Sequence, residues 1–98
     1  MNTYAILRRN GWRTPEELEA AAVRSGEVGD EQMPDDVRWI RSYVLVETDG
    51  SLGSVCIYQA TGPEAVRRHA DVADLPVDEI LPVADTVIVR PDPVPAAA

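Results

Sequence analysis

The single histidine of this chain, His69, is the side chain best suited to acid–base chemistry or to metal binding. It shares one stripe of a predicted helix with Val66, Ala70 and Ala73, and therefore faces the interior. In that place a histidine serves either as a structural hydrogen-bonding residue or as a catalytic acid–base group or metal ligand. One histidine is too few for a conventional transition-metal site, so carboxylates, Cys56 or a second copy of the chain would have to complete it.

Arginine and aromatic side chains form a second candidate site. We predict that one open face of a sheet is lined by Arg8, Trp39, Arg41, Tyr43 and Tyr58. A guanidinium beside aromatic rings favours a small, planar, anionic or aromatic ligand, because it forms paired hydrogen bonds and stacks on rings. The same residues would also suit an interface between two copies of the chain, with Arg41 paired to an acid.

The only cysteine, Cys56, cannot form a disulfide within the chain. Its place in the middle of a predicted strand indicates a buried thiol, and buried thiols are usually inert. No apolar run approaches ~20 residues, and no signal peptide precedes the first strand. These features predict a cytoplasmic protein without a membrane segment.

The composition excludes several functions. A net charge of −8 disfavours nucleic acid as a partner, because phosphate binding needs a basic face. All 9 basic residues are arginine, and a chain without lysine cannot form a Schiff base. The acid-rich stretch 30–36 lacks the alternating oxygen spacing of a calcium loop and is predicted to be solvated.

Residues 3–9 are predicted to form the first strand, with apolar side chains on both faces. A helix then begins, because Thr14 is a good N-cap and Glu17 completes a capping box. Gly26 is predicted to end this helix, and residues 27–36 to form a polar loop. The buried stripe of the helix is thin and carries Leu18, Ala21, Ala22 and Ser25.

The clearest strand is predicted over residues 37–48. Strict alternation divides its side chains between two faces. One face carries Trp39, Arg41, Tyr43 and Leu45, and the other carries Ile40, Ser42, Val44 and Val46. The Asp-Gly pair at 49–50 predicts a hairpin turn into a return strand at 54–60.

A second capping box, Thr61 and Glu64, predicts a second helix that Leu75-Pro76 ends. The last strand is predicted over residues 79–89. Pro82 within it places this strand at a sheet edge, because proline has no N–H for a second neighbour.

The element order β-α-β-β-α-β predicts an α+β ferredoxin-like sandwich, a four-stranded antiparallel sheet with two helices on one face. Residues 1–90 would form one domain, and residues 91–98 a disordered tail rich in proline and alanine. The second sheet face would expose Trp39, Tyr43 and Leu45 unless something covers it. We expect a second copy to do so, which gives a homodimeric α/β barrel with a cleft between two sheets.

With these residues in view, the chain resembles a bacterial family known as domain of unknown function 4242, some members of which are called nickel-binding proteins. The resemblance is carried by the stretches "LEAAAVRSGEV", "VRWIRSYV", "VCIYQATGPEAVRRHA" and "LPVDEI". It implies a ferredoxin-like fold and a homodimer.

The resemblance also bears on nickel. The nickel-binding members are histidine-rich, whereas the corresponding segments here read "ILRR", "AAAVRS" and "AVRRHA", so only His69 matches a family histidine. Closer relatives carry histidine where this chain has Arg41. Arginine stays protonated and is a poor metal ligand, so the resemblance implies at most weak nickel binding through His69.

Three functions follow from these residues. The first is a homodimeric binding protein for a small molecule, or weakly for a divalent metal such as nickel, that uses the cleft between the sheets. The second is a cofactor-free enzyme of the isomerase or monooxygenase type, with His69 as its acid–base group. The third is a structural subunit without a ligand.

Overall fold

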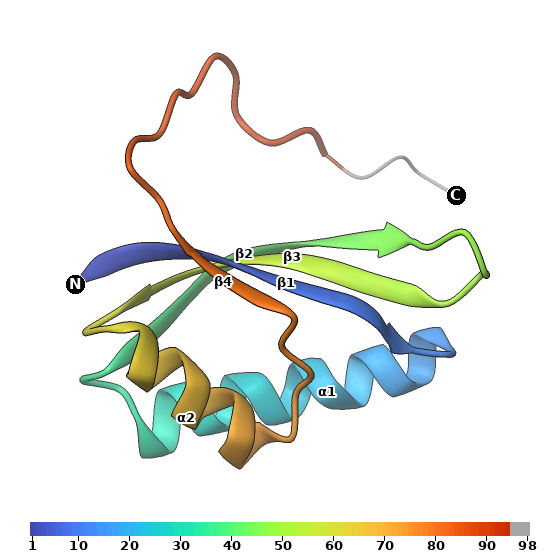
Figure 1. The fold of residues 1–98 in the computed structure, drawn as a ribbon, viewed down its shortest axis with the longest axis horizontal. Helices are drawn as coiled ribbons and strands as arrows, with labels where there is room; N and C mark the ends of the chain where they lie inside the picture. The colour runs from blue at the N-terminus through green and yellow to red at the C-terminus, as the bar shows by residue number, and fades with distance from the viewer. Residues whose placement is uncertain (95–98) are drawn as a thin grey trace.

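The computed structural model describes residues 1–94 and has the predicted βαββαβ order. A four-stranded antiparallel sheet has the strand order β2-β3-β1-β4, and both helices lie on one side of it (Figure 1). The ferredoxin-like prediction is therefore confirmed. The elements are β1 (Asn2–Trp12), α1 (Pro15–Glu27), a π-helical turn (Val28–Gln32), β2 (Val37–Val46), β3 (Leu52–Ala60), α2 (Pro63–Ala73) and β4 (Glu79–Pro82).

A bulge in β2 changes which side chains share a face. Trp39 lies opposite Tyr58 and Arg41 lies opposite Ile57, so Ile40 has no partner on β3. Because strand side chains alternate, one extra residue moves Trp39 to the opposite face from Arg41. The predicted face that joined Trp39 to Arg41 and Tyr43 is therefore wrong. Trp39 faces the helices, whereas Arg41 and Tyr43 face away from them.

The start of α1 is confirmed, and its predicted end is wrong. The Thr14 hydroxyl accepts a hydrogen bond from the Glu17 N–H at 3.2 Å, and the Glu17 carboxylate accepts one from the Arg13 N–H at 2.7 Å. The helix continues past Gly26 and runs into the π-helical turn, where a loop was predicted. It continues because Val28 in the π-helical turn has core residues to pack against, as does Met33 directly after it.

The second helix and the last strand also differ from the predicted boundaries. Gly62 is the N-cap of α2, and no side chain caps this helix, so the predicted box of Thr61 and Glu64 is wrong. The strand β4 ends at Pro82 rather than at residue 89. One further sheet bond follows, from the Val83 N–H to the Thr3 carbonyl at 2.9 Å. The edge position of β4 is confirmed.

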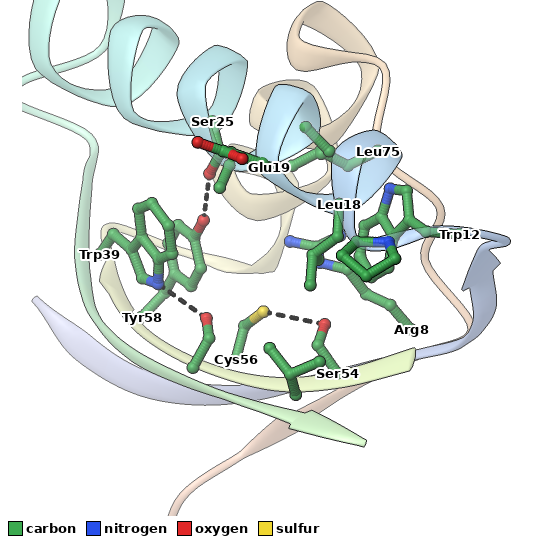
Figure 2. A pocket seen from close by; sticks show the side chains of 15 residues that line it. Arg8, Trp12, Leu18, Glu19, Ser25, Trp39, Ser54, Cys56, Tyr58 and Leu75 are labelled. Atoms are coloured by element: carbon green, nitrogen blue, oxygen red, sulfur yellow. Dashed lines mark hydrogen bonds between the residues drawn. The ribbon is translucent and has the colours of Figure 1, made fainter. Parts of the chain in front are cut away.

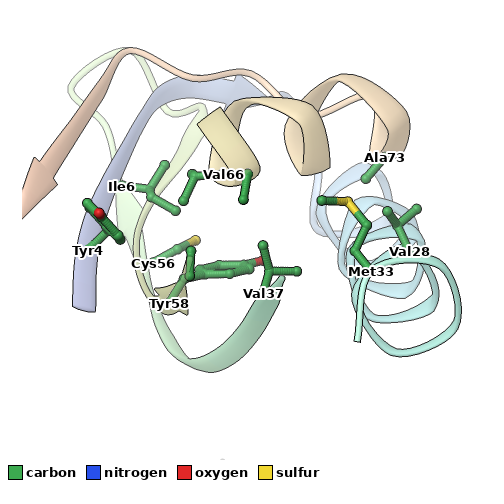
Figure 3. Packing of buried hydrophobic residues seen from close by; sticks show 11 residues of the cluster. Tyr4, Ile6, Val28, Met33, Val37, Cys56, Tyr58, Val66 and Ala73 are labelled. Carbon is green, nitrogen blue, oxygen red and sulfur yellow. The ribbon is translucent and has the colours of Figure 1, made fainter. Parts of the chain in front are cut away.

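The core fills the space between the helices and the sheet (Figure 3). Its centre combines sheet residues with small and branched residues of α2. The cluster contains Tyr4, Ile6, Val28, Met33, Val37, Cys56, Tyr58, Ala60, Ala65, Val66 and Ala73. None of the helices within residues 1–94 is long and apolar enough to cross a membrane.

The other sheet face carries no helix (Figure 1). We call it the open face; its central residues are Ala5, Leu7, Arg41, Tyr43, Val55 and Ile57. The segment after β4 passes on this side, and Asp92 contacts both Arg41, at 3.4 Å, and the Tyr43 hydroxyl, at 2.7 Å. Residues 83–94 contain no helix or strand. The predicted disorder at residues 95–98 lies outside the described residues.

Candidate functional site

A pocket of about 240 Å³ lies between α1 and the β2–β3 half of the sheet (Figure 2). It exists because the face of α1 over this part of the sheet is built from small side chains, which leave space above the strands. Figure 2 shows Trp39 and Tyr58 at one end of the pocket and Trp12 at the other, with the Arg8 side chain reaching into the space between them. The lining residues are Arg8, Trp12, Pro15, Leu18, Glu19, Ala21, Ala22, Ser25, Trp39, Ser42, Val44, Ser54, Cys56, Tyr58 and Leu75.

Two stacked aromatic rings form one end of the pocket. The rings of Trp39 and Tyr58 have centroids 6.2 Å apart and are nearly parallel. The Trp39 indole N–H donates to the Ser42 hydroxyl at 2.8 Å, which fixes the ring's orientation. Trp39 is 41% exposed and Tyr58 is buried, so the pair runs from the surface into the core. An aromatic or aliphatic ligand would find flat apolar surface here.

The polar groups on the pocket walls are mostly bonded to one another. The hydroxyls of Tyr58 and Ser25 lie 2.6 Å apart, and the Ser54 hydroxyl lies 3.3 Å from the Cys56 sulfur. Burial raises the pKa of the Tyr58 hydroxyl, although the bond to Ser25 opposes that rise, so this group stays protonated at neutral pH.

Arg8 is the exception among these polar groups. The side chain rises from β1 and is 1% exposed. Its Nη1 donates to the Pro76 carbonyl at 2.7 Å. Its buried Nη2 has no hydrogen-bond partner among the described residues. Arg8 also forms no ion pair among these residues, whose ion pairs involve Arg9, Arg41 and Arg68. A buried guanidinium without a counter-ion is costly, because it has lost its hydration and gained little in return.

His69 lies behind the pocket rather than in its lining. It is buried on α2, and its Nε2 lies 3.0 Å from the Ser25 carbonyl of α1. A carbonyl only accepts, so Nε2 carries the proton and donates. Burial lowers the pKa of His69; the bond to Ser25 opposes this, and the charge of Arg8 adds to it. The neutral ring therefore ties the two helices together at neutral pH.

The described residues do not fit a metal site within one chain. No group of three or more histidine, cysteine, aspartate or glutamate side chains comes together in residues 1–94. His69 already uses one ring nitrogen for the Ser25 carbonyl, and the Cys56 sulfur contacts the Ser54 hydroxyl. These residues therefore give no basis for a function that uses nickel bound by one chain.

The five arginine and aromatic residues predicted to share the open face divide into two groups. Arg8, Trp39 and Tyr58 come together in the pocket on the helix side, which corrects their predicted placement. Arg41 and Tyr43 lie on the open face, as predicted, where Asp92 binds both. The sequence predicted a buried Cys56 and a thin stripe of small residues on the first helix, but it did not predict that these small residues lie over Tyr58 and Cys56. That thin stripe was the signal for the pocket.

Comparison with known proteins places the chain in a family. A model of the nickel-responsive protein family called SCO4226-like matches residues 4–83. No curated protein matches the sequence significantly. The crystal structure of SCO4226 from Streptomyces coelicolor A3(2) is similar, with a TM-score of 0.66 and 19% identity over 87% of this chain and 99% of that chain, which shows the shared fold. Because the family model spans most of its length, this chain belongs to the SCO4226-like family of nickel-responsive proteins.

Proposed function

We propose that this protein binds a small, largely apolar molecule in the pocket between α1 and the sheet, and that it does so in the cytoplasm. The observation that carries the proposal is the unfilled volume of about 240 Å³ against the Trp39–Tyr58 pair. Small-molecule sites are typically concave and mostly apolar, with a few polar groups, and this pocket has that character. The sheet-to-sheet cleft predicted from the sequence would hold only Arg41 and Tyr43 of the expected ligand residues.

The volume sets the size of the ligand. An apolar cavity of about 150 Å³ holds a benzene molecule. The pocket therefore has room for one ring with a short substituent, or for an aliphatic chain of similar volume. Glu19 and Trp39 are exposed and stand at the rim, which gives such a molecule a route from solvent.

We infer binding in preference to the enzyme alternative, because that alternative gives the acid–base role to His69, which is not among the pocket residues. In the enzyme alternative, His69 would have to act on a ligand that lies on the other side of Tyr58. The ring centroids of His69 and Tyr58 are 5.3 Å apart. No contact of the described residues favours that arrangement.

We further propose a homodimer packed through the open face. Three facts support it: both helices lie on the other side of the sheet, the open face carries Leu7, Val55 and Ile57 at its centre, and Tyr43 is 44% exposed. A contiguous apolar surface of this kind is typical of an interaction site.

Binding in the pocket is tested by filling it. Ala22→Leu adds three carbon atoms to the α1 side of the pocket, and Ala20→Leu makes the same change on an exposed position of the same helix. Indole and other small neutral ring compounds serve as probes, followed by NMR chemical shifts of the protein. We expect saturable binding to the parent, at least tenfold weaker binding to Ala22→Leu, and unchanged binding to Ala20→Leu. Probes that bind all three proteins equally, or none of them, would refute the pocket as the site.

A further inference from the structure

Apart from the exposed Glu19 carboxylate at the rim, the pocket has one strong polar feature, the Nη2 of Arg8, which has no hydrogen-bond partner among the described residues. The hydrogen bond from Nη1 to the Pro76 carbonyl anchors the guanidinium and leaves the second nitrogen without a partner in the described chain. Figure 2 shows the Arg8 side chain extending into the space between α1 and the sheet. A charged donor in apolar surroundings forms its strongest bond with an anion, since little water competes for either group.

We propose that the ligand of this pocket carries one carboxylate, which Arg8 binds through Nη2 while the apolar body of the ligand lies against Trp39 and Tyr58. The inference rests on the proposed function and adds the chemical class of the ligand. The Arg8 side chain lies between Trp12 and the two rings, so a carboxylate on Nη2 would leave the apolar body of the ligand beside the Trp39–Tyr58 pair (Figure 2).

A carboxylate fits better than a phosphate or phosphonate. Arg8 is the one cation of the lining, and the other donors of the lining are neutral hydroxyl and indole groups. A dianion with three oxygens would leave most of its charge and most of its acceptors unpaired in the pocket, which is costly. A single carboxylate matches the single positive charge.

The rest of the molecule would not attract such a ligand. The net charge of −8 repels anions at long range. Any preference for a carboxylate must therefore arise locally at Arg8. The Nη2 atom is covered by neighbouring side chains, so binding requires a small displacement of one of them, such as Leu18 beside it in the lining.

The test compares matched pairs of probes that differ in charge alone: phenylacetate with phenylacetamide, and benzoate with benzamide. We expect each carboxylate to bind the parent at least tenfold more tightly than its amide. In Arg8→Met, which keeps an unbranched apolar side chain about as long as the arginine stem but removes the guanidinium, the ratio should fall to about one. The control Arg41→Met removes an arginine from the open face and should keep the parent ratio. Tighter binding of phenylphosphonate than of phenylacetate would overturn the assignment of the class.

A second measurement needs no variant and covers the case in which Arg8→Met fails to fold. Burial lowers the pKa of His69, the hydrogen bond to the Ser25 carbonyl opposes this, and the charge of Arg8 lowers the pKa further. A carboxylate on Arg8 would offset that charge, so saturating phenylacetate should raise the pKa of His69 measured by NMR, and phenylacetamide should not. Equal effects of both probes would contradict the proposal.

The two proposals fail in different ways. If each amide binds as tightly as its carboxylate, and Ala22→Leu weakens both, the pocket binds ligands and Arg8 is satisfied by an internal water instead. If neither the charged nor the neutral probes bind the parent, the pocket itself is not a ligand site.

Discussion

At the scale of single residues, the buried polar groups divide into those that stabilise the fold and one, Arg8, that keeps a donor for a ligand. Glu47 accepts hydrogen bonds from the Arg9 side chain and the Asn10 N–H, and these bonds lower the pKa of its carboxyl. His69 and Ser25 tie the helices together. Each of these groups forms its hydrogen bonds within the protein, so we assign it to the stability of the fold and not to ligand binding. Arg8 retains a free donor, which is why it is the residue assigned to a ligand.

The pH dependence of stability should report on His69. Its pKa in the folded protein lies below the ordinary value of 6.5, so below pH 6.5 the unfolded chain binds more protons. The free energy of unfolding should therefore fall as the pH decreases below about 6.5, until the pH has passed the lowered pKa of the folded protein. Glu47, whose pKa is also lowered, contributes only below about 4.5. Chemical denaturation at several pH values should show this slope for the parent and a flatter one for His69→Gln. An equal slope in both would show that another group titrates.

Nickel binding to the single chain should be weak. The family name concerns nickel, but His69 donates Nε2–H to the Ser25 carbonyl, and no three-ligand group forms among residues 1–94. Titration calorimetry should show no binding tighter than about micromolar, equivalent to about −8 kcal/mol. Stoichiometric nanomolar binding would contradict this and would point to ligands contributed by two copies of the chain.

At the scale of elements, the local signals of α1 located its start but not its end. The N-terminus of α1 could be predicted because Thr14 and Glu17 satisfy free N–H groups within four residues of each other, a purely local effect. Its end could not, because Gly26 is tolerated inside the helix when Val28 and Met33 pack into a core formed by distant strands. Tertiary packing outweighed the local preference of glycine.

This difference leads to a contrast between two glycines. A Cβ at Gly26 would meet nothing within 4 Å, and the residue lies inside α1. Gly26→Ala should therefore stabilise the protein by about 0.5–1 kcal/mol, because alanine loses less backbone entropy on folding. A Cβ at Gly53 would lie 2.6 Å from the Arg8 carbonyl, so Gly53→Ala should be destabilising. Urea denaturation of both variants checks the two signs, and a destabilised Gly26→Ala would show that the helix does not extend through residue 26.

The bulge in β2 explains why the candidate site was only partly predictable. Strict alternation along β2 assigned Trp39 to the same face as Arg41 and Tyr43, and one unpaired residue, Ile40, reversed that assignment. Nothing in the local sequence marks the bulge, since it carries neither glycine nor proline. The sequence therefore identified the residue types suited to ligand binding. It could not identify the face on which Trp39 lies, because that face depends on how β2 pairs with β3.

At the scale of the whole molecule, the order of elements sufficed for the fold. Six segments in the order β-α-β-β-α-β allow few antiparallel arrangements, and the predicted sandwich is the one observed. The same order also implied that one sheet face has no helix, which the structure bears out (Figure 1). The oligomeric state does not follow from the order of elements, because it depends on what covers the open face.

Assembly through the open face should be sensitive to a charge at its centre. Val55 lies between Leu7 and Tyr43 in the sheet register, and its half-buried side chain faces away from the helices. In a dimer that buries this face, Val55→Asp would place a carboxylate in an apolar interface without a partner, which is strongly unfavourable. In a monomer the same carboxylate would remain hydrated. We therefore expect a dimer mass for the parent by light scattering at micromolar concentration, and a monomer mass for the variant.

The control for this experiment is Val23→Asp, which adds the same charge at an exposed position of α1 on the helix side of the molecule. It should remain a dimer, because the helix layer points away from the proposed interface. Circular dichroism should show that both variants keep the parental fold, since neither side chain belongs to the core cluster. The segment that carries Asp92 also passes on the open face and pairs with Arg41 and Tyr43, so a partner sheet must share this surface with it. A parent protein that is monomeric at micromolar concentration would show that this segment, rather than a second copy, is what the open face accommodates.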